Sequence, residues 1–176
     1  MPSITAFVAL FVYASFFEWT LHRFLMHTRI WHYPFKSHAV VHHGIFRSGP
    51  TYLLLSGQSY KNIRFAWWNA PLIIGLHAPV ILWIAWVLQA NIFLGGMAAL
   101  GVYYFLYEYL HFCMHVPKGR WIEKSAWFSW LDAHHHQHHE RHLKNLNVVL
   151  PLADLIFGTL IPTARRIPRP LRNTGV

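Results

Sequence analysis

Long uncharged stretches alternate with polar, histidine-rich stretches along this chain. Residues 1–17 contain no charged side chain, and neither do the 43 residues 65–107. One membrane crossing takes roughly 20 apolar residues, so the second stretch is long enough for two. The polar tripeptide 89–91 and the pair Gly95-Gly96 interrupt it, as expected near a turn. We therefore predict three membrane helices, at about 4–20, 65–88 and 92–111.

The remaining segments are polar or too short to cross a membrane. Residues 116–147 combine polar side chains with several tryptophans, which is typical of an amphipathic helix at a membrane interface. The apolar segment 150–161 is expected to lie in the interface or over a site, and the tail 162–176 is basic. These features predict a single domain, residues 1–176, with an all-α integral-membrane fold. It has three to four membrane helices, a histidine-rich helical cap and a histidine core at residues 18–160.

Basic side chains are confined to the polar segments. The 15 lysines and arginines fall between Arg23 and Arg64 and between Lys118 and Arg172. Basic segments beside apolar helices mark the cytoplasmic side of a membrane protein. The formal net charge of +9 is then expected to face anionic lipid headgroups or an acidic redox partner, rather than nucleic acid. The single cysteine, Cys113, excludes a disulfide framework and a CxxC motif.

Most of the 15 histidines lie in four clusters. The clusters are His22 with His27; His38 with His42 and His43; His111 with His115; and His135 with His138 and His139. In the predicted topology all four lie on the cytoplasmic side, so they can meet in one site. Imidazole suits zinc, copper, iron and nickel, and ten rings are too many for one ion. The pattern predicts two metal ions held almost entirely by histidine.

The spacing within the clusters indicates how the rings are shared. Histidines three or four residues apart lie on one face of an α-helix, which applies to the third and fourth clusters. His22 and His27 are five apart and are expected to straddle the site. His38 and His42 are four apart, with His43 turned by about 100°. The doublets in the second and fourth clusters can each give one ring to each of two ions.

Carboxylates precede three of the clusters by three or four residues: Glu18, Glu108 and Asp132. A ligating histidine usually donates its second N–H to an acceptor that fixes its orientation, so we predict that these carboxylates are such acceptors. His77, isolated in an apolar stretch, is interpreted as structural. The remaining histidines are weaker ligand candidates: His32, His134, His136 and His142.

A site for two divalent ions built from imidazoles has few anionic ligands, so it favours bound oxygen anions. Its place beside apolar helices predicts a lipid-like substrate. A di-iron oxygenase that uses dioxygen as co-substrate satisfies both conditions. Zinc fits the same ligands but has no redox chemistry.

The histidine clusters and their surroundings resemble the fatty acid hydroxylase / sterol desaturase superfamily of integral-membrane di-iron enzymes. The matching segments are 18–27 (EWTLHRFLMH), 38–43 (HAVVHH), 107–115 (YEYLHFCMH) and 135–160 (HHQHHERHLKNLNVVLPLADLIFGTL). The last segment is the most specific, since its HxxHH box is followed by Asn147, an apolar stretch, Asp154 and the tripeptide 157–159.

The resemblance implies a four-helix-like membrane domain, two metals in the histidine boxes, and hydroxylation or desaturation of a lipid chain with dioxygen. By matching boxes it implies ligand roles for His22, His27, His38, His42, His43, His111, His115, His135, His138 and His139. The second box reads HxxxHH, whereas the family usually has HxxHH, and the extra residue rotates His38 on a helix. No role follows for Asn147 or Asp154, and no catalytic residue beyond the metal centre is assigned.

The chain has no HPGG haem-binding motif, no GxGxxG and no iron–sulfur cysteine spacing. We therefore expect electrons from a separate carrier of the ferredoxin or cytochrome type, docked on the basic face. The expected function is a membrane-bound di-iron oxygenase acting on a lipid chain. Two alternatives remain open: a carotenoid ring hydroxylase of the same superfamily, and a non-catalytic membrane metal-binding protein.

Overall fold

The computed structural model describes residues 2–162, and every regular element within them is helical. The all-α prediction is therefore confirmed. Most of the predicted basic tail, residues 163–176, lies outside the described residues. The long helices are α1 (Pro2–Thr20), α4 (Asn69–Val87), α5 (Phe93–His115) and α6 (Ala126–Glu140), and the short ones are α2 (His32–Phe35), α3 (His43–Ile45) and α7 (Leu152–Ile156). Two π-helical segments, η1 (Leu21–Met26) and η2 (Lys36–His42), and three 3-10 turns, η3 (Gly49–Tyr52), η4 (Tyr60–Asn62) and η5 (Ile122–Lys124), complete the order.

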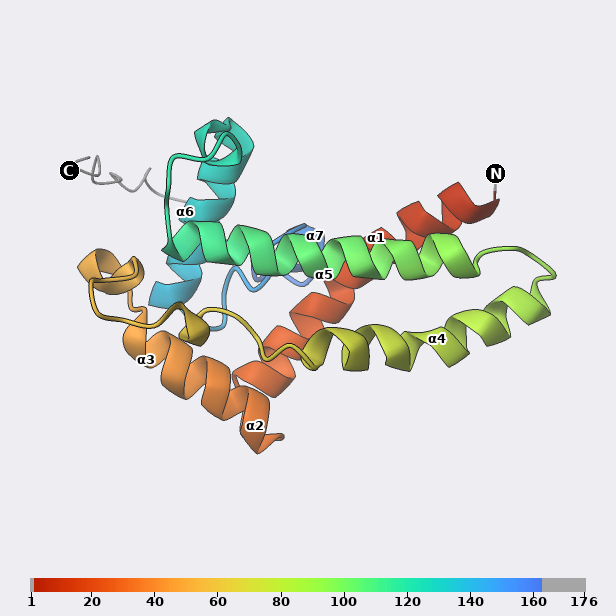
Figure 1. The fold of residues 1–176 in the computed structure, drawn as a ribbon, viewed down its shortest axis with the longest axis horizontal. Helices are drawn as coiled ribbons and strands as arrows, with labels where there is room; N and C mark the ends of the chain where they lie inside the picture. Colours follow the sequence, from red (N-terminus) through yellow and green to blue (C-terminus); the bar gives the residue numbers. More distant parts are fainter. Residues whose placement is uncertain (1, 163–176) are drawn as a thin grey trace.

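α4 and α5 form a hairpin, and α1 packs against α5 (Figure 1). The chain reverses between Leu88 and Ile92, where Gln89 has a φ of 50°. The pair Gly95-Gly96 does not divide the hairpin, as the sequence suggested, but lies inside α5. A Cβ on Gly95 would be 2.0 Å from the carbonyl oxygen of Ser3. The glycine therefore allows the backbone of α1 to approach α5 closely.

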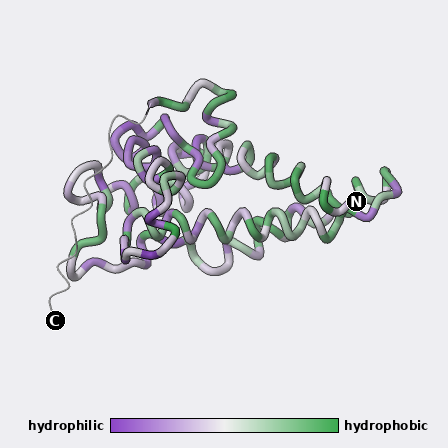
Figure 2. Tube along the Cα trace, turned by 90° about the horizontal axis from the view of Figure 1, so that it is seen from above, coloured by the Kyte–Doolittle hydropathy of each residue, from purple (hydrophilic) through white to green (hydrophobic). Residues whose placement is uncertain are grey.

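Two helical segments are long and apolar enough to cross a membrane, Pro2–Met26 and Asn69–Val87. α4 exposes large apolar side chains, among them Leu76 at 65% and Trp86 at 70%. The third predicted crossing corresponds to α5. This helix is long enough but not as apolar as the other two, because it contains tyrosines, a glutamate and histidines. Hydrophilic residues gather mainly at the end of the molecule far from the N-terminus (Figure 2).

α6 is shorter than the amphipathic helix predicted over residues 116–147. It begins after Ser125, whose Oγ accepts a hydrogen bond from the backbone N–H of Phe128 at 3.1 Å. A serine in this position stabilises a helix start, since it satisfies a donor that has no partner inside the helix. Leu131 and four of the five histidines of α6 are buried, His136 being partly exposed, so this helix turns its histidine face into the protein.

The segment after α6 folds back onto α1. We call residues 145–160 the latch. The carboxylate of Asp154 accepts hydrogen bonds from the backbone N–H groups of Leu146 (2.9 Å) and Asn147 (2.7 Å). It also accepts from the hydroxyl of Thr159 at 2.6 Å and bonds Nε2 of His134 at 3.2 Å. Asp154 is fully buried, so its hydrogen bonds hold the two ends of the latch together in the protein interior.

The latch is fastened to α1 by Asn147 and Glu18. The side-chain amide of Asn147 donates to the Ser15 carbonyl (2.8 Å) and to Glu18 (3.0 Å). Glu18 also accepts from the backbone N–H of Val148 at 2.6 Å. The segment 150–161, predicted to lie in the interface or over the site, is thus held against α1. These contacts give Asn147 and Asp154 a role that the sequence did not supply.

We predict that Asp154→Asn destabilises the protein by about 3 kcal/mol or more, because an amide cannot accept all the bonds that the buried carboxylate receives. Burial raises the pKa of Asp154, but its hydrogen bonds with His134, Thr159 and the latch backbone outweigh this and lower the pKa below its ordinary value of 3.8. The ionised Asp154 carboxylate therefore contributes fully to the free energy of unfolding at neutral pH. This contribution is lost as the pH falls through the lowered pKa.

Thermal unfolding in detergent measures this difference, with the exposed Glu140→Gln as the control. The melting temperature of Asp154→Asn should fall well below that of Glu140→Gln at pH 7, and the gap should narrow in acid. Equal melting temperatures for both variants at pH 7 would contradict the role given to Asp154.

Candidate metal centre

Ten histidines converge in two groups at the hydrophilic end of the molecule. Group A consists of His22, His27, His38, His43 and His138, and group B of His42, His111, His115, His135 and His139. Within each group, one ring nitrogen from every histidine lies within 4.8 Å of the others. All ten are buried except His27, which is partly exposed. The four sequence clusters therefore meet in one place, and two buried groups of five imidazoles could hold two metal ions.

These ten are the histidines for which the sequence predicted ligand roles. The doublet His42-His43 gives His43 to group A and His42 to group B. The doublet His138-His139 is divided in the same way. Adjacent residues on a helix point about 100° apart, which is why a doublet can serve two neighbouring groups.

η1 explains why His22 and His27 belong together. We expected these two histidines, five residues apart, to straddle the site, and that expectation is wrong. The segment is a π-helix, in which the hydrogen bonds run from i to i+5, so residues five apart lie on one face. The two rings stack at 5.1 Å with an interplanar angle of 21°, and both belong to group A.

η2 gives the same explanation for His38. The backbone N–H of His43 bonds the carbonyl of His38, five residues earlier, and both side chains belong to group A. His42, one residue before His43, turns to group B. The extra residue of the HxxxHH spacing is thus absorbed by a π-helix. π-Helical turns are rare and often occur at functional sites.

The Nε2 atoms face one another across each group. In group A the Nε2–Nε2 distances are 2.8 Å for His22–His38, 3.1 Å for His38–His43, 3.1 Å for His43–His138 and 3.2 Å for His27–His138. In group B they are 3.3 Å for His42–His111, 3.3 Å for His42–His139, 3.0 Å for His135–His139 and 3.2 Å for His115–His135.

These separations fit ligands of a common ion. With a metal–nitrogen distance of about 2.1 Å, neighbouring ligands in octahedral or tetrahedral geometry lie roughly 3.0–3.4 Å apart. A hydrogen-bonded network is a poorer account, because a neutral imidazole has only one N–H to donate. In five of the ten rings that N–H donates to a backbone carbonyl outside the two groups.

Backbone carbonyls orient those five rings. Nδ1 of His42 donates to the Asn62 carbonyl at 3.0 Å, and Nδ1 of His115 to the Tyr52 carbonyl at 2.7 Å. The same bond joins His22 to Leu146, His138 to Lys144 and His139 to Phe46. A carbonyl only accepts, so the proton is on Nδ1 and the lone pair is on Nε2. Each of these rings therefore directs a lone pair into its group.

The predicted carboxylate acceptors are wrong for Glu18 and Glu108. Glu18 accepts from the latch and from the Tyr103 hydroxyl (2.6 Å), and Glu108 accepts from the Phe65 backbone and the Tyr104 hydroxyl. Asp132 accepts a hydrogen bond from the hydroxyl of Tyr52 at 3.1 Å. Because the Tyr52 carbonyl orients His115, Asp132 supports the site through that tyrosine.

The other five histidines lie outside both groups. His77 bonds the carbonyl of Ile73 at 2.7 Å and the hydroxyl of Tyr13 at 3.1 Å, consistent with a structural role. His134 bonds Asp154. The rest are His32, which is exposed, His136, which accepts from the Gly49 backbone, and His142, whose ring lies 4.4 Å from that of His43.

Burial keeps the imidazoles neutral. It lowers the pKa of His42 to about 4 and, together with the neighbouring histidines, lowers the pKa of His27 to about 2. Burial and mutual repulsion also hold the pKa values of His38, His135, His138 and His139 well below their ordinary value. At neutral pH the lone pairs are therefore free of protons, which is the form that binds metal.

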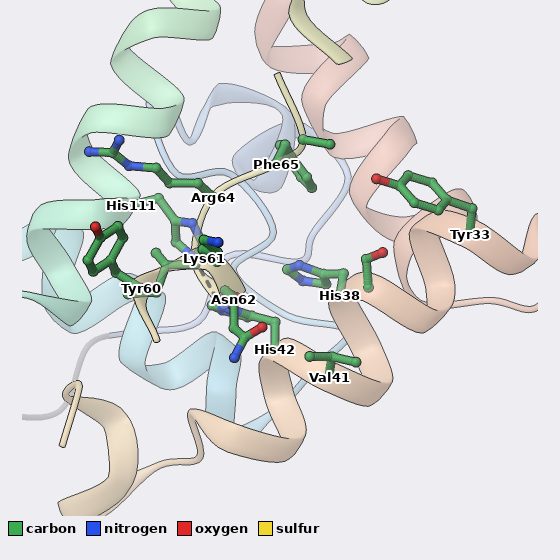
Figure 3. Close-up of a pocket in the computed structure, with 13 residues that line it drawn as sticks. Tyr33, His38, Val41, His42, Tyr60, Lys61, Asn62, Arg64, Phe65 and His111 are labelled. Carbon is green, nitrogen blue, oxygen red and sulfur yellow. Dashed lines mark hydrogen bonds between the residues drawn. The ribbon is translucent and has the colours of Figure 1, made fainter. Parts of the chain in front are cut away.

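A cavity reaches both groups from outside. Its volume is about 530 Å³, and its walls include His38 of group A with His42 and His111 of group B (Figure 3). The segment from Tyr60 to Ala66 also lines it. A small molecule in this cavity can approach both groups at once.

Comparison with protein-family models, curated proteins and solved structures gave no match.

We predict that each group holds its own ion. The double variant His43→Ala/His138→Ala should lose about one of two bound metal ions per chain, and His115→Ala/His135→Ala should lose the other, because each removes two of five ligands. Elemental analysis of purified protein measures the stoichiometry. His32→Ala, an exposed histidine outside both groups, should leave it unchanged. Two ions retained in either double variant would refute the grouping.

We also predict that deleting Phe24 removes about one metal ion per chain. The deletion shortens the His22–His27 spacing to four residues and removes the extra residue that the π-turn accommodates, so the two rings no longer converge as η1 places them. Deleting Gly57, which lies exposed in a loop, is the control. Undiminished metal content after deletion of Phe24 would show that the π-helix is not required.

Proposed function

We propose that this protein is a membrane-bound di-iron oxygenase that hydroxylates or desaturates a lipid chain, using dioxygen and electrons from a separate carrier. The observation that carries the proposal is the pair of five-imidazole groups opening onto one shared cavity. The resemblance of the four histidine segments to the fatty acid hydroxylase / sterol desaturase superfamily supports the same function.

The donor set fits iron. Imidazole is a good ligand for iron, as it is for zinc and copper, and each group offers five converging nitrogens. Iron in these groups would supply redox chemistry. In hydroxylation, one oxygen atom of dioxygen would enter the lipid and the other would leave as water with two electrons and two protons. In desaturation, the lipid would lose two hydrogens, and with the same two electrons and two protons both oxygen atoms would leave as water. Zinc in the same ligands has no redox chemistry, so the identity of the metal decides between an oxygenase and a non-catalytic binding protein.

The protein's own residues have three tasks in this proposal. The ten imidazoles hold the ions without adding negative charge. The carbonyls of the latch and of the loops fix the rings, so that no ligand has to reorient during turnover. The apolar surfaces of α1 and α4 would bring the site close to the lipid phase. Electrons arrive from a carrier of the ferredoxin or cytochrome type, for which the basic surface is the proposed dock.

The test combines metal content with oxygen incorporation. We expect about two irons per chain in protein purified in detergent from iron-supplemented cells. With lipid extract, isotopically labelled dioxygen and a reducing system, a lipid should gain one labelled oxygen atom or lose two hydrogens. His43→Ala/His138→Ala should abolish both reactions. Zinc that iron loading does not replace, together with no lipid product, would favour the metal-binding protein. A carotenoid product would favour the ring hydroxylase.

A further inference from the structure

Group A has one edge that is open to solvent. Of its five histidines only His27 is partly exposed, while the other four and all five of group B are buried. His142, which belongs to neither group, is exposed and lies at this edge. Its ring centroid is 4.4 Å from that of His43 and 5.6 Å from that of His27. An exposed, a partly exposed and a buried imidazole therefore lie side by side between the surface and group A.

The ring of His142 is as close to His43 as the members of group A are to one another. Within the group, ring centroids are 4.4 Å apart for His22 and His138 and 5.0 Å apart for His27 and His43. The ring of His142 is 6.4 Å from that of His138, however, and its nitrogens are not among those that converge. His142 thus contacts group A at its outer edge without being one of its five members.

A short turn presents His142. α6 ends at Glu140, and the backbone N–H of Lys144 donates to the carbonyl of Arg141 at 2.8 Å, which closes the turn around His142. The carbonyl of Lys144 accepts a hydrogen bond from Nδ1 of His138 at 3.0 Å. The backbone that carries His142 is therefore fixed to a member of group A, while the His142 side chain stays exposed.

His43 has a ring nitrogen to which the structure gives no partner. Its Nε2 lies 3.1 Å from Nε2 of His38 and 3.1 Å from Nε2 of His138. Its Nδ1 is buried and has no hydrogen-bond partner among the described residues. Since a neutral imidazole carries one proton, that proton can sit on Nε2 and be shared inside group A until an ion arrives there. The lone pair on Nδ1 is then available to an incoming cation.

We propose that His142 is an entry ligand for group A. A divalent transition-metal cation is bound first by the exposed ring of His142 and then passes to His27 and His43. Charge does not draw a cation to this turn, because Arg141 precedes His142 and Lys144 follows it, so a coordinating lone pair has to hold the ion. Only coordination bonds form and break along this route, and no oxidant or reductant takes part.

Exchange of bound zinc tests this role on the intact protein, because an ion leaves by the path through which it enters. Zinc-loaded protein in detergent is mixed with an excess of an enriched zinc isotope, and mass spectrometry follows the bound isotopes over time. In His142→Ala one of the two ions should exchange about tenfold more slowly, the scale on which a residue outside the ligand set alters metal binding. Zinc content and melting temperature should stay unchanged. The control His32→Ala, at another exposed histidine, should exchange at the original rate.

Two double variants show which ion uses the route. In His115→Ala/His135→Ala, which keeps group A, the added His142→Ala should slow exchange. In His43→Ala/His138→Ala, which keeps group B, it should have no effect. His142→Cys, kept reduced, should restore fast exchange, because a thiolate is also a zinc ligand. A ring that only packs against its neighbours would not be replaced by a thiol in this way.

Three results would overturn the proposal. Unchanged exchange in His142→Ala would remove the route, faster exchange would make His142 a lid, and zinc lost at equilibrium would make it a permanent ligand. The inference rests on the candidate metal centre and goes beyond the proposed function, since the exchange needs neither lipid nor dioxygen. Slowed exchange in a protein that oxygenates no lipid would count against the oxygenase and leave the entry ligand standing. Oxygenation by a protein whose exchange is insensitive to His142 would do the reverse.

Discussion

Ten imidazoles in contact with one another, nine of them buried, are the constraint on which this structure depends. Each ring has two nitrogens, and burying either one without a partner costs free energy. For five rings, Nδ1 is satisfied by a backbone carbonyl, and Nε2 is left facing other Nε2 atoms. Two groups of converging lone pairs are unfavourable on their own. A cation between them would make the arrangement favourable, and its binding would then be coupled to the folding of this region.

The carbonyls that orient the rings have to be held in place themselves, and the latch does this for two of them. Leu146 and Lys144, at or just before its start, present their carbonyls to His22 and His138 of group A. The buried carboxylate of Asp154 accepts hydrogen bonds from the backbone N–H groups of Leu146 and Asn147. The side chain of Asn147 joins this segment to α1. The buried carboxylate of Asp154, fifteen residues after the nearest histidine cluster, therefore supports the candidate metal centre.

The sequence predicted the helical fold, the convergence of four clusters and the ten histidines, because helical periodicity and histidine spacing are local signals. It failed where the answer depended on backbone geometry. The π-helices that unite His22 with His27 and His38 with His43 leave no mark in an α-helical periodicity. The acceptors for the rings proved to be main-chain carbonyls, which every residue possesses, so no residue type could reveal them. Glu18 and Glu108 were misassigned because a spacing of three or four residues in the sequence cannot show that each carboxylate accepts hydrogen bonds from another segment.

The neutrality of the ligand shell links the metal centre to its cavity. Group A and group B contain no carboxylate, so two divalent cations bound there would keep most of their charge. That charge would add to Lys61 and Arg64 at the cavity wall. Because both groups are largely buried, the field of such ions is weakly screened, and it acts on any molecule in the cavity. Such a field would stabilise negatively charged oxygen species, so a ligand shell without acids suits the proposed chemistry.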